Sequence, residues 1–472
     1  MISDVIFNNP NIDNMWVALK TSDIEITYGM LKEYIQNFAG YILNKGCGAG
    51  KKVLLWLNNS PEFIVSYFAI NLLGATAILV DTKFRHEILD IIKENHVEFI
   101  ITDSLQEKLF DFNKSLITII VNNEYLKYEQ AKGFEHYLQH MILDEKQIST
   151  ILYTSGSTGK PKGVMNSHTN LKEALINYSS TLNFSNQDRF IGVVPFFHSY
   201  AFDSCMLSAL NCGATIFLMS NFVPARVLRI IQEEKITVFH GVPYMYKLIC
   251  GQLKSASYDC SSLRLCVCAG SRLEEKCFRD FYDLTNKVIH QEYGSTETGT
   301  IAVNLCNEIE KAIKYVGKPL KNVGLKLVTA DGLEESTLMV ISKGMAIGYI
   351  GEEPFDPKGY LTQDLCELED GYLWIKGRAD RLINITGLKV NPIEVENCLR
   401  QHPDILDVYV KGNASEKFGE EVEAIIVRKK DSLTISEVIT HCRKYLAAYK
   451  VPSIITWVKG IEKSGLGKSK VM

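Results

Sequence analysis

The residues best suited to chemistry lie in a short segment, Tyr153–Val164, that follows the apolar pair Ile151-Leu152. Glycines let a backbone fold closely around an anion, serine and threonine hydroxyls donate to phosphate oxygens, and lysines add positive charge. The segment therefore predicts a loop that binds a polyphosphate. It is not a Walker loop, because Gly156 and Gly159 are too close together for that pattern. A flexible serine-glycine linker is disfavoured by the Lys-Pro-Lys-Gly sequence that ends the segment.

This loop resembles the signature of the superfamily of adenylate-forming enzymes, which contains acyl- and aryl-CoA synthetases, peptide-synthetase adenylation domains and luciferases. The pattern is most similar to the acyl- and aryl-CoA synthetases. Further motifs of that superfamily follow in the expected order across nearly the whole chain, namely Tyr293–Glu297, Tyr360–Asp364, Gly377–Asp380, Gly387–Val390, Glu394–Glu396 and Gly467–Lys468.

The resemblance implies an α/β protein with a large N-terminal adenylate-forming domain and a small, mobile α+β lid domain. It also implies a ligase that activates a carboxylic acid with ATP to an acyl-adenylate and releases pyrophosphate. The acyl group then passes to the pantetheine thiol of CoA or of a carrier protein. Two alternatives stay open: a stand-alone adenylation enzyme that loads an amino acid onto a carrier protein, and a luciferase-like monooxygenase. Intact Lys468, Glu297 and Asp364 argue against a nucleotide-binding protein without catalysis.

The resemblance also assigns residues to the nucleotide. Asp364 would accept hydrogen bonds from the ribose hydroxyls, with Arg378 as a nearby donor. Thr296 and Glu297 would lie at the α-phosphate, and Glu297 would bind Mg²⁺, which prefers carboxylate oxygen. The full set expected to bind ATP is Thr154, Ser155, Gly156, Ser157, Thr158, Gly159, Lys162, Tyr293, Gly294, Ser295, Asp364 and Arg378.

Two further residues are expected to act on the acid. Lys468 would bridge the substrate carboxylate and the α-phosphate while charge develops during adenylation. His198, in Pro195–Tyr200, stands where CoA-forming members of the superfamily carry a histidine, and would orient the carboxylate or gate the acyl pocket. His240 is expected to pack near the wall of that pocket.

The acid itself is only partly specified. Amino-acid-activating relatives carry an aspartate where this chain has Ser199, and a buried ammonium without a carboxylate partner is costly. An α-amino acid is therefore disfavoured, although Asp203 keeps it open. The proposed pocket is apolar and suits an aryl or an aliphatic acid; it consists of His198, Ser199, Tyr200, Phe202, Val242, Cys268, Ala269 and Gly270.

The acceptor is expected to be a thiol, by the same resemblance. A turn of the lid about Asp380 would withdraw Lys468 and present Gly387 and Lys389, with Gly387 leaving room for a pantetheine arm. Free CoA and a separate carrier protein both remain open. The chain departs from the superfamily pattern at Gln363, where a glycine is usual, and in the segment before Lys468, which lacks the usual proline and basic residues.

The elements that must position these residues follow an alternating pattern. Short runs rich in valine and isoleucine alternate with helical patterns, which predicts a parallel α/β architecture; these runs are Lys52–Leu57, Phe99–Thr102, Leu116–Val121 and Thr215–Leu218. The apolar stretch Phe63–Val80 is interrupted by Ser66, Asn71 and Gly74. It predicts a buried helix, a break at Gly74 and a strand over Thr76–Val80 rather than a membrane span.

The pattern changes after Asp370 to short strands and amphipathic helices. A helix is expected over Asn391–Arg400, with Pro392 near its start. The polar turn Gly377–Arg381 is the predicted boundary. Residues 1–379 would form the N-terminal adenylation domain, and residues 380–472 the lid.

Composition is that of an ordinary globular protein, with 46% hydrophobic residues, 22% charged residues and a net charge of −4. No excess of charge points to nucleic acid or an anionic membrane, so a small carboxylic acid is the expected ligand. The 12 cysteines are scattered and the start of the chain does not resemble a secretory signal, which favours reduced thiols and the cytoplasm. Oligomeric state and pathway stay open.

Overall fold

The computed structural model describes residues 1–84, 87–104, 116–121, 134–141, 144–154, 161–329, 336–385, 388–415, 419–463 and 469–470. The chain divides into two compact units. The N-terminal unit comprises Met1–Ile313, Pro319–Gly324 and Ile341–Tyr360, and the C-terminal unit comprises Lys314–Lys318, Leu325–Val340 and Leu361–Met472.

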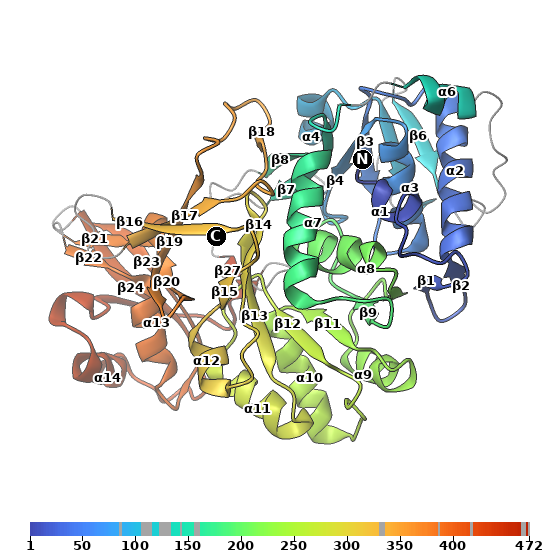
Figure 1. The fold of residues 1–472 in the computed structure, drawn as a ribbon. Coiled ribbons are helices and arrows are strands. Elements are labelled where there is room, and N and C mark those ends of the chain that lie inside the picture. The colour runs from blue at the N-terminus through green and yellow to red at the C-terminus, as the bar shows by residue number, and fades with distance from the viewer. Residues whose placement is uncertain are drawn as a thin grey trace. The chain divides into compact units, whose positions relative to one another are not determined.

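The first large sheet of the N-terminal unit has seven strands, in the order β18-β8-β7-β4-β3-β5-β6. Strands β7, β4, β3, β5 and β6 are parallel, whereas β8 and β18 are antiparallel to their neighbours. Helices α2 and α3 lie beside this sheet (Figure 1). The strands are β3 (Lys52–Trp56), β4 (Thr76–Leu79), β5 (Phe99–Thr102), β6 (Ile117–Ile120), β7 (Ile148–Thr154), β8 (Lys162–Ser167) and β18 (Gly348–Tyr349).

The second large sheet has nine strands, in the order β15-β14-β13-β12-β11-β9-β10-β1-β2, of which β15 is the two-residue strand Lys318–Pro319. It is parallel from β13 to β1, whereas β14 is antiparallel to β13 and β2 is antiparallel to β1. The carboxyl ends of its parallel strands therefore meet at one edge. The strands are β1 (Val17–Lys20), β2 (Glu25–Thr27), β9 (Arg189–Gly192), β10 (Thr215–Leu218), β11 (Val238–Gly241), β12 (Leu265–Cys268), β13 (Ile289–Ser295) and β14 (Gly299–Val303).

Helices cover these sheets, with α9, α10 and α11 grouped beside the second (Figure 1). Helix α7 begins with a capping box formed by Ser167 and Asn170, and η2 is a π-helix, a geometry often found at functional sites. The helices are α1 (Asp4–Phe7), α2 (Tyr28–Asn44), α3 (Pro61–Leu72), α4 (Glu87–Asn95), α6 (Phe134–His140), α7 (His168–Leu182), η2 (Ala201–Leu207), α8 (Ser208–Asn211), α9 (Pro224–Glu233), α10 (Pro243–Ser255), α11 (Glu275–Thr285) and α12 (Ile309–Lys314).

The predicted strands are confirmed at β3, β5, β6 and β10. The apolar stretch after Ser60 forms α3, which is buried, and then β4. Gly74 separates the two with a φ of 70°, a left-handed conformation that favours glycine. Among the described residues, no helix has the length and apolar character needed to cross a membrane.

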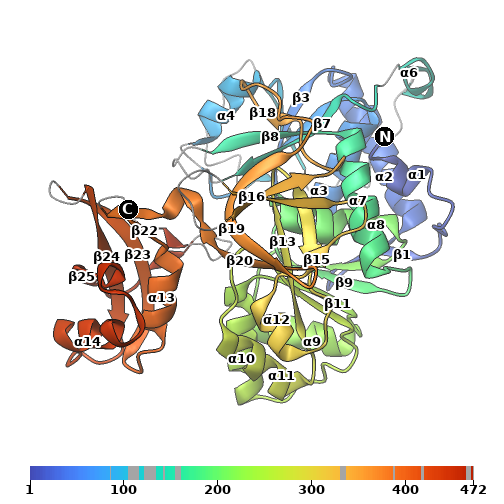
Figure 2. The ribbon, with the colours of Figure 1, turned by 60° about the vertical axis from the view of Figure 1, so that its left-hand side comes forward.

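The C-terminal unit contains a four-stranded sheet in the order β16-β17-β19-β20 and a five-stranded sheet built on β22-β21-β24-β23, with β25 beside β24. Helices α13 and α14 pack on the five-stranded sheet (Figure 2). Val395, Leu399, Val408 and Val438 belong to their shared core. The elements are β16 (Gly324–Thr329), β17 (Ser336–Ile341), β19 (Tyr360–Glu369), β20 (Tyr372–Arg378), η3 (Ala379–Arg381), β21 (Ile383–Ile385), β22 (Leu388–Val390), α13 (Pro392–Arg400), β23 (Ile405–Ser415), β24 (Gly419–Arg428), α14 (Ile435–Tyr445), η4 (Ala448–Lys450), β25 (Ile454–Trp457), β26 (Glu462–Lys463) and β27 (Ser469–Lys470).

Two details differ from the sequence prediction. The strands here are not all short, because β23 has 11 residues and β24 has 10, joined in one long antiparallel ladder. The turn predicted over Gly377–Arg381 also begins two residues later than expected, because Gly377 and Arg378 still belong to β20 and pair with β19. The helix at Pro392 is confirmed, and the Asn391 side chain caps it by accepting from the Ile393 N–H at 3.0 Å.

Candidate active site

The predicted phosphate loop joins two paired strands. Strand β7 ends at Thr154 and β8 begins at Lys162, and these two residues are register partners in an antiparallel ladder. The ladder therefore fixes both ends of the loop. The loop residues expected to bind ATP, Ser155, Gly156, Ser157, Thr158 and Gly159, lie outside the described residues.

Tyr349 connects this loop with the predicted metal ligand. The ammonium of Lys162 lies 4.5 Å from the centre of the Tyr349 ring. The Tyr349 hydroxyl donates to Oε1 of Glu297 at 2.7 Å. Burial, together with hydrogen bonds to Tyr360 and Glu297, raises the pKa of Tyr349, so its hydroxyl stays protonated and can donate. Sequence reasoning missed Tyr349, although Gly348, Gly351 and Glu352 flank it in the sequence.

The second nucleotide motif forms the β13–β14 hairpin. Gly294 has no room for a side chain, because a Cβ there would collide with the Gly299 carbonyl oxygen and lie 2.8 Å from Cα of Thr300. The ladder is irregular between Tyr293 and Gly294, which brings the two strands close. The Ser295 hydroxyl lies 3.1 Å from that of Thr298, which ties the turn together. The glycine of this motif is thus required by backbone packing.

Thr296 meets the predicted acid pocket through Ser199, since their hydroxyl oxygens are 3.1 Å apart. The segment that carries His198 is held in place by Asn59. The Asn59 side chain donates to the Val194 carbonyl at 2.9 Å and accepts from the Phe196 N–H at 2.8 Å. Asn59 was not predicted, because the pair Asn58-Asn59 after a strand carries no recognisable signal.

Other pocket residues lie at the carboxyl ends of β11 and β12. The Tyr200 hydroxyl donates to the carbonyls of Gly241 at 3.3 Å and Val267 at 3.2 Å. His240 is 1% exposed and packs edge to face against Tyr200. The remaining predicted residues divide into buried Phe202, Val242, Cys268 and Ala269 and exposed Gly270.

The predicted ribose residues lie in the C-terminal unit. Asp364 and Arg378 are register partners across β19 and β20, and Nη1 of Arg378 lies 3.4 Å from Oδ1 of Asp364. The same guanidinium also binds Asp380, the predicted hinge residue, through two hydrogen bonds of 2.9 and 2.8 Å. Arg378 therefore contacts both the predicted ribose-binding residue Asp364 and the predicted hinge residue Asp380.

Two predicted residues of this unit, Gly387 and Lys468, lie outside the described residues. Lys389 is in β22, where it is the register partner of Asn384 in β21.

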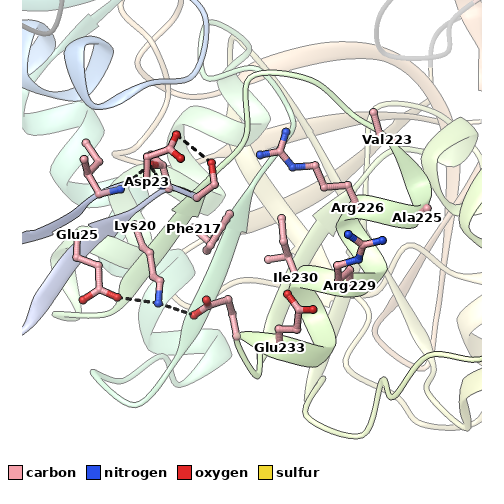
Figure 3. Close-up of a pocket in the computed structure, with 14 residues that line it drawn as sticks. Lys20, Asp23, Glu25, Phe217, Val223, Ala225, Arg226, Arg229, Ile230 and Glu233 are labelled. Atoms are coloured by element: carbon pink, nitrogen blue, oxygen red, sulfur yellow. Dashed lines mark hydrogen bonds and ion pairs between the residues drawn. The ribbon is translucent and has the colours of Figure 1, made fainter.

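A hollow of about 740 Å³ lies between the β1–β2 hairpin and α9. Figure 3 shows the Arg226 side chain extending from α9 toward the hairpin, where Lys20 pairs with Glu25. The described residues that line this hollow include none of the predicted site residues. It is separate from the motifs above.

Known protein families match this chain over most of its length. The family model described as AMP-binding enzyme matches residues 10–350, and that of the AMP-binding enzyme C-terminal domain matches residues 394–468. YngI of Bacillus subtilis strain 168 is 28% identical, over 96% of this chain and 92% of that protein. 4-Coumarate–CoA ligase 1 of Arabidopsis thaliana is 29% identical, over 94% of this chain and 86% of that protein.

Among solved structures, o-succinylbenzoate coenzyme A synthetase of Bacillus subtilis in complex with ATP and magnesium ion superimposes with a TM-score of 0.86. It is 25% identical, and the match covers 98% of each chain. The fold is therefore that of the adenylate-forming enzymes, with a large N-terminal domain and a C-terminal domain. This chain belongs to the AMP-binding enzyme family, within the superfamily of adenylate-forming enzymes.

Proposed function

We propose that this enzyme activates a small carboxylic acid with ATP to an acyl-adenylate and transfers the acyl group to the thiol of CoA. The observation that carries the proposal is the arrangement around Tyr349. One ring contacts Lys162, at the end of the predicted phosphate loop, and its hydroxyl holds Glu297, the predicted metal ligand. A cation and a carboxylate converge there from motifs far apart in the sequence, as binding of a metal–polyphosphate requires. The relatives described above include a named CoA ligase and a synthetase bound to ATP.

Glu297 is the proposed ligand of Mg²⁺, and the donor chemistry fits, because a carboxylate oxygen is a preferred ligand for this cation. Among the described residues, no group of three histidine, cysteine, aspartate or glutamate side chains could hold a metal. Mg²⁺ bound with one carboxylate takes its remaining ligands from phosphates and water. When bound, it would neutralise charge on the phosphates.

The remaining roles are proposed as follows. Thr296, beside Ser199, contacts the α-phosphate next to the acid carboxylate. His198, on the segment held by Asn59, orients that carboxylate. Asp364 and Arg378 bind the ribose, and Lys468 stabilises the charge that develops during adenylation.

For the second half-reaction, the boundary at residues 379 and 380 is proposed to let the lid, residues 380–472, turn about Asp380. Gly387 and Lys389 would then serve the thiol step. A carrier protein with a pantetheine arm is the alternative acceptor, and the cytoplasm stays a prediction.

The test is pyrophosphate exchange into ATP across aryl, aliphatic and amino acids, followed by mass detection of the thioester after CoA is added. Exchange with one class of acid and an acyl-CoA product support the proposal. Exchange without acyl-CoA formation would redirect the acceptor to a carrier protein. Absence of exchange with every acid would overturn the proposal.

Lys468→Ala should lower exchange at least a hundredfold, equivalent to about 2.7 kcal/mol of transition-state stabilisation. The exposed Lys459 offers a matched control, because Lys459→Ala removes the same charge from the same part of the chain. Equal rates for the two variants would contradict the role of Lys468.

A further inference from the structure

A buried carboxylate, Glu292, lies four residues before Thr296 on β13. It is 6% exposed and accepts hydrogen bonds from three hydroxyls: Tyr178 at 2.7 Å, Ser204 at 2.7 Å and Thr300 at 2.5 Å. These donors come from α7, η2 and β14. No ion pair between Glu292 and a lysine or arginine occurs in the described part of the chain. Its charge is therefore stabilised by neutral groups alone, which is costly for a buried carboxylate.

Asp203, the residue before Ser204 on the π-helix, adds a second carboxyl group to the same region. Its Oδ1 atom is buried and has no hydrogen-bond partner. Burial and repulsion from Glu292 raise the pKa of Asp203 to about 7. Burial likewise raises the pKa of Glu292 to about 7, although its three hydroxyl donors oppose the rise. Because Asp203 and Glu292 repel each other when both are ionised, a cation close to them would stabilise their charged forms.

His240 presents a second buried acceptor without a partner. Its Nε2 atom lies 3.0 Å from the Tyr178 oxygen. Because the Tyr178 hydroxyl donates to Glu292, it must accept from Nε2–H, which leaves Nδ1 of His240 as an acceptor. That Nδ1 atom is buried and unpartnered. Burial lowers the pKa of His240 to about 3, so the ring is neutral and its acceptor persists at neutral pH.

These groups adjoin the proposed acid pocket. The His240 ring lies 5.7 Å from that of Tyr200, and Ser199, which contacts Thr296, precedes Asp203 by one turn of the chain. Buried acceptors are almost always paired in folded proteins. Two acceptors here lack a partner, Oδ1 of Asp203 and Nδ1 of His240, and Glu292 adds a second carboxyl group. Together they indicate a missing donor that carries positive charge.

We propose that the acid activated by this enzyme carries a protonated amine beyond the α-position, and that Asp203, Glu292 and His240 bind that amine. This inference rests on the proposed function. An ammonium has three N–H donors, which can satisfy Oδ1 of Asp203 and Nδ1 of His240 while its charge offsets the carboxylates. Ser199, in place of the aspartate of α-amino-acid-activating relatives, fits an amine held further from the reacting carboxylate. A second carboxylate on the substrate would be repelled.

Matched pairs of acids test the proposal, with a methyl group replacing the ammonium in each pair. The pairs are β-alanine and butanoate, γ-aminobutyrate and pentanoate, and meta-(aminomethyl)benzoate and meta-ethylbenzoate. We expect the amine of at least one pair to be preferred about a hundredfold in kcat/KM of pyrophosphate exchange, since a site built for hydrogen bonding rejects the analogue that lacks the donor.

Asp203→Asn and Glu292→Gln should each reduce that preference at least tenfold. Asp283→Asn, an exposed carboxylate on α11, is the matched control and should preserve it. The preference is a ratio within one variant, so loss of folded protein cancels. Because two variants are tested separately, failure of one to fold leaves the other informative.

The outcomes separate this inference from the proposed function. Exchange with the uncharged member of every pair at equal or higher kcat/KM would overturn the inference while the ligase function stands. A preference for amines that neither variant changes would also overturn it. No exchange with any acid in a broad panel would sink the proposed function itself.

Discussion

The carboxylates of Glu292 and Asp364 are held in opposite ways. Glu292 is buried, and its Tyr178 and Ser204 partners are 114 and 88 residues away in the sequence. Asp364 pairs with Arg378, 14 residues away across one hairpin, and Arg378 is 40% exposed. Buried polar groups without partners are costly, whereas exposed ion pairs are screened by water. We therefore expect changes near Glu292 to affect folding far more than changes near Asp364.

The largest effect is expected from Gly294→Ala, two residues after Glu292. The new Cβ would collide with backbone of the paired strand, which has no flexible side chain to move aside. Overpacking of this kind costs about 3 kcal/mol, measurable by urea unfolding, and exchange activity should fall with it. Gly251→Ala, at an exposed helical position with open space around it, is the control and should be neutral or stabilising. Equal midpoints for the two variants would refute the packing argument.

Tyr178→Phe should come next. It removes the donor to Glu292 and the acceptor for His240 while keeping the ring, so we expect a loss of about 1 to 3 kcal/mol in unfolding free energy. Tyr282→Phe, on the exposed face of α11, should change stability by less than about 0.5 kcal/mol. Similar losses of unfolding free energy for the two variants would mean that the hydrogen bond from the Tyr178 hydroxyl to Glu292 contributes little to stability.

Glu292→Gln should change the pH dependence of stability. Because folding raises the pKa of Glu292 from 4.5 to about 7, its contribution favours the folded state below pH 4.5 and is lost as pH rises through 7. Glutamine does not titrate. The variant should therefore gain on the wild type by up to about 1.4 kcal/mol per pH unit between pH 4.5 and 7. Urea unfolding at both ends of that range measures the difference.

Other groups facing Glu292 have contributions of their own. Burial raises the pKa of Asp203 to about 7, which acts with the same sign. Burial lowers the pKa of His240 to about 3, so acid destabilises the fold through it below pH 6.5. The His240 contribution remains in the variant and cancels in the comparison. Asp203 does not cancel fully, because loss of repulsion from Glu292 lowers its pKa in the variant, so the measured difference belongs to the Asp203–Glu292 pair. A difference between the two proteins that does not vary with pH would show that folding does not raise the pKa of Glu292.

The smallest effect is expected from Asp380→Asn in the second region. The Arg378–Asp380 pair is partly exposed, so its loss should cost less than about 1 kcal/mol and less still at high salt. If Asp380 is a hinge, thioester formation should change more than pyrophosphate exchange. A stability loss as large as that of Tyr178→Phe would contradict the expectation that changes near Glu292 affect folding more than changes near Asp364.

Several local features of the fold could be predicted from the amino-acid sequence. The strands β3, β5 and β10 and the helix–break–strand sequence around Gly74 follow from local apolar runs and a glycine that only one conformation suits. The pairing of Asp364 with Arg378 joins two motifs that were already assigned to the same ribose. Such features depend on residues close together in the sequence, so short sequence patterns predict them.

Other features had no short-range pattern. Tyr349 and Asn59 resemble ordinary residues until folding brings them to Glu297 and to the His198 segment. The length of β23 and β24 likewise depends on the ladder that they form together.

The sequence alone therefore determined the family, the reaction class and the order of the motifs, because each motif is a contiguous set of residues that one ligand group needs. Only the tertiary structure decided that Glu292, Asp203 and His240 share one buried region, with two acceptors left unpaired. The physical reason is that burial and hydrogen bonding depend on residues from α7, η2, β11, β13 and β14 together. The cost of an unpaired buried group exists only once the chain has closed around it.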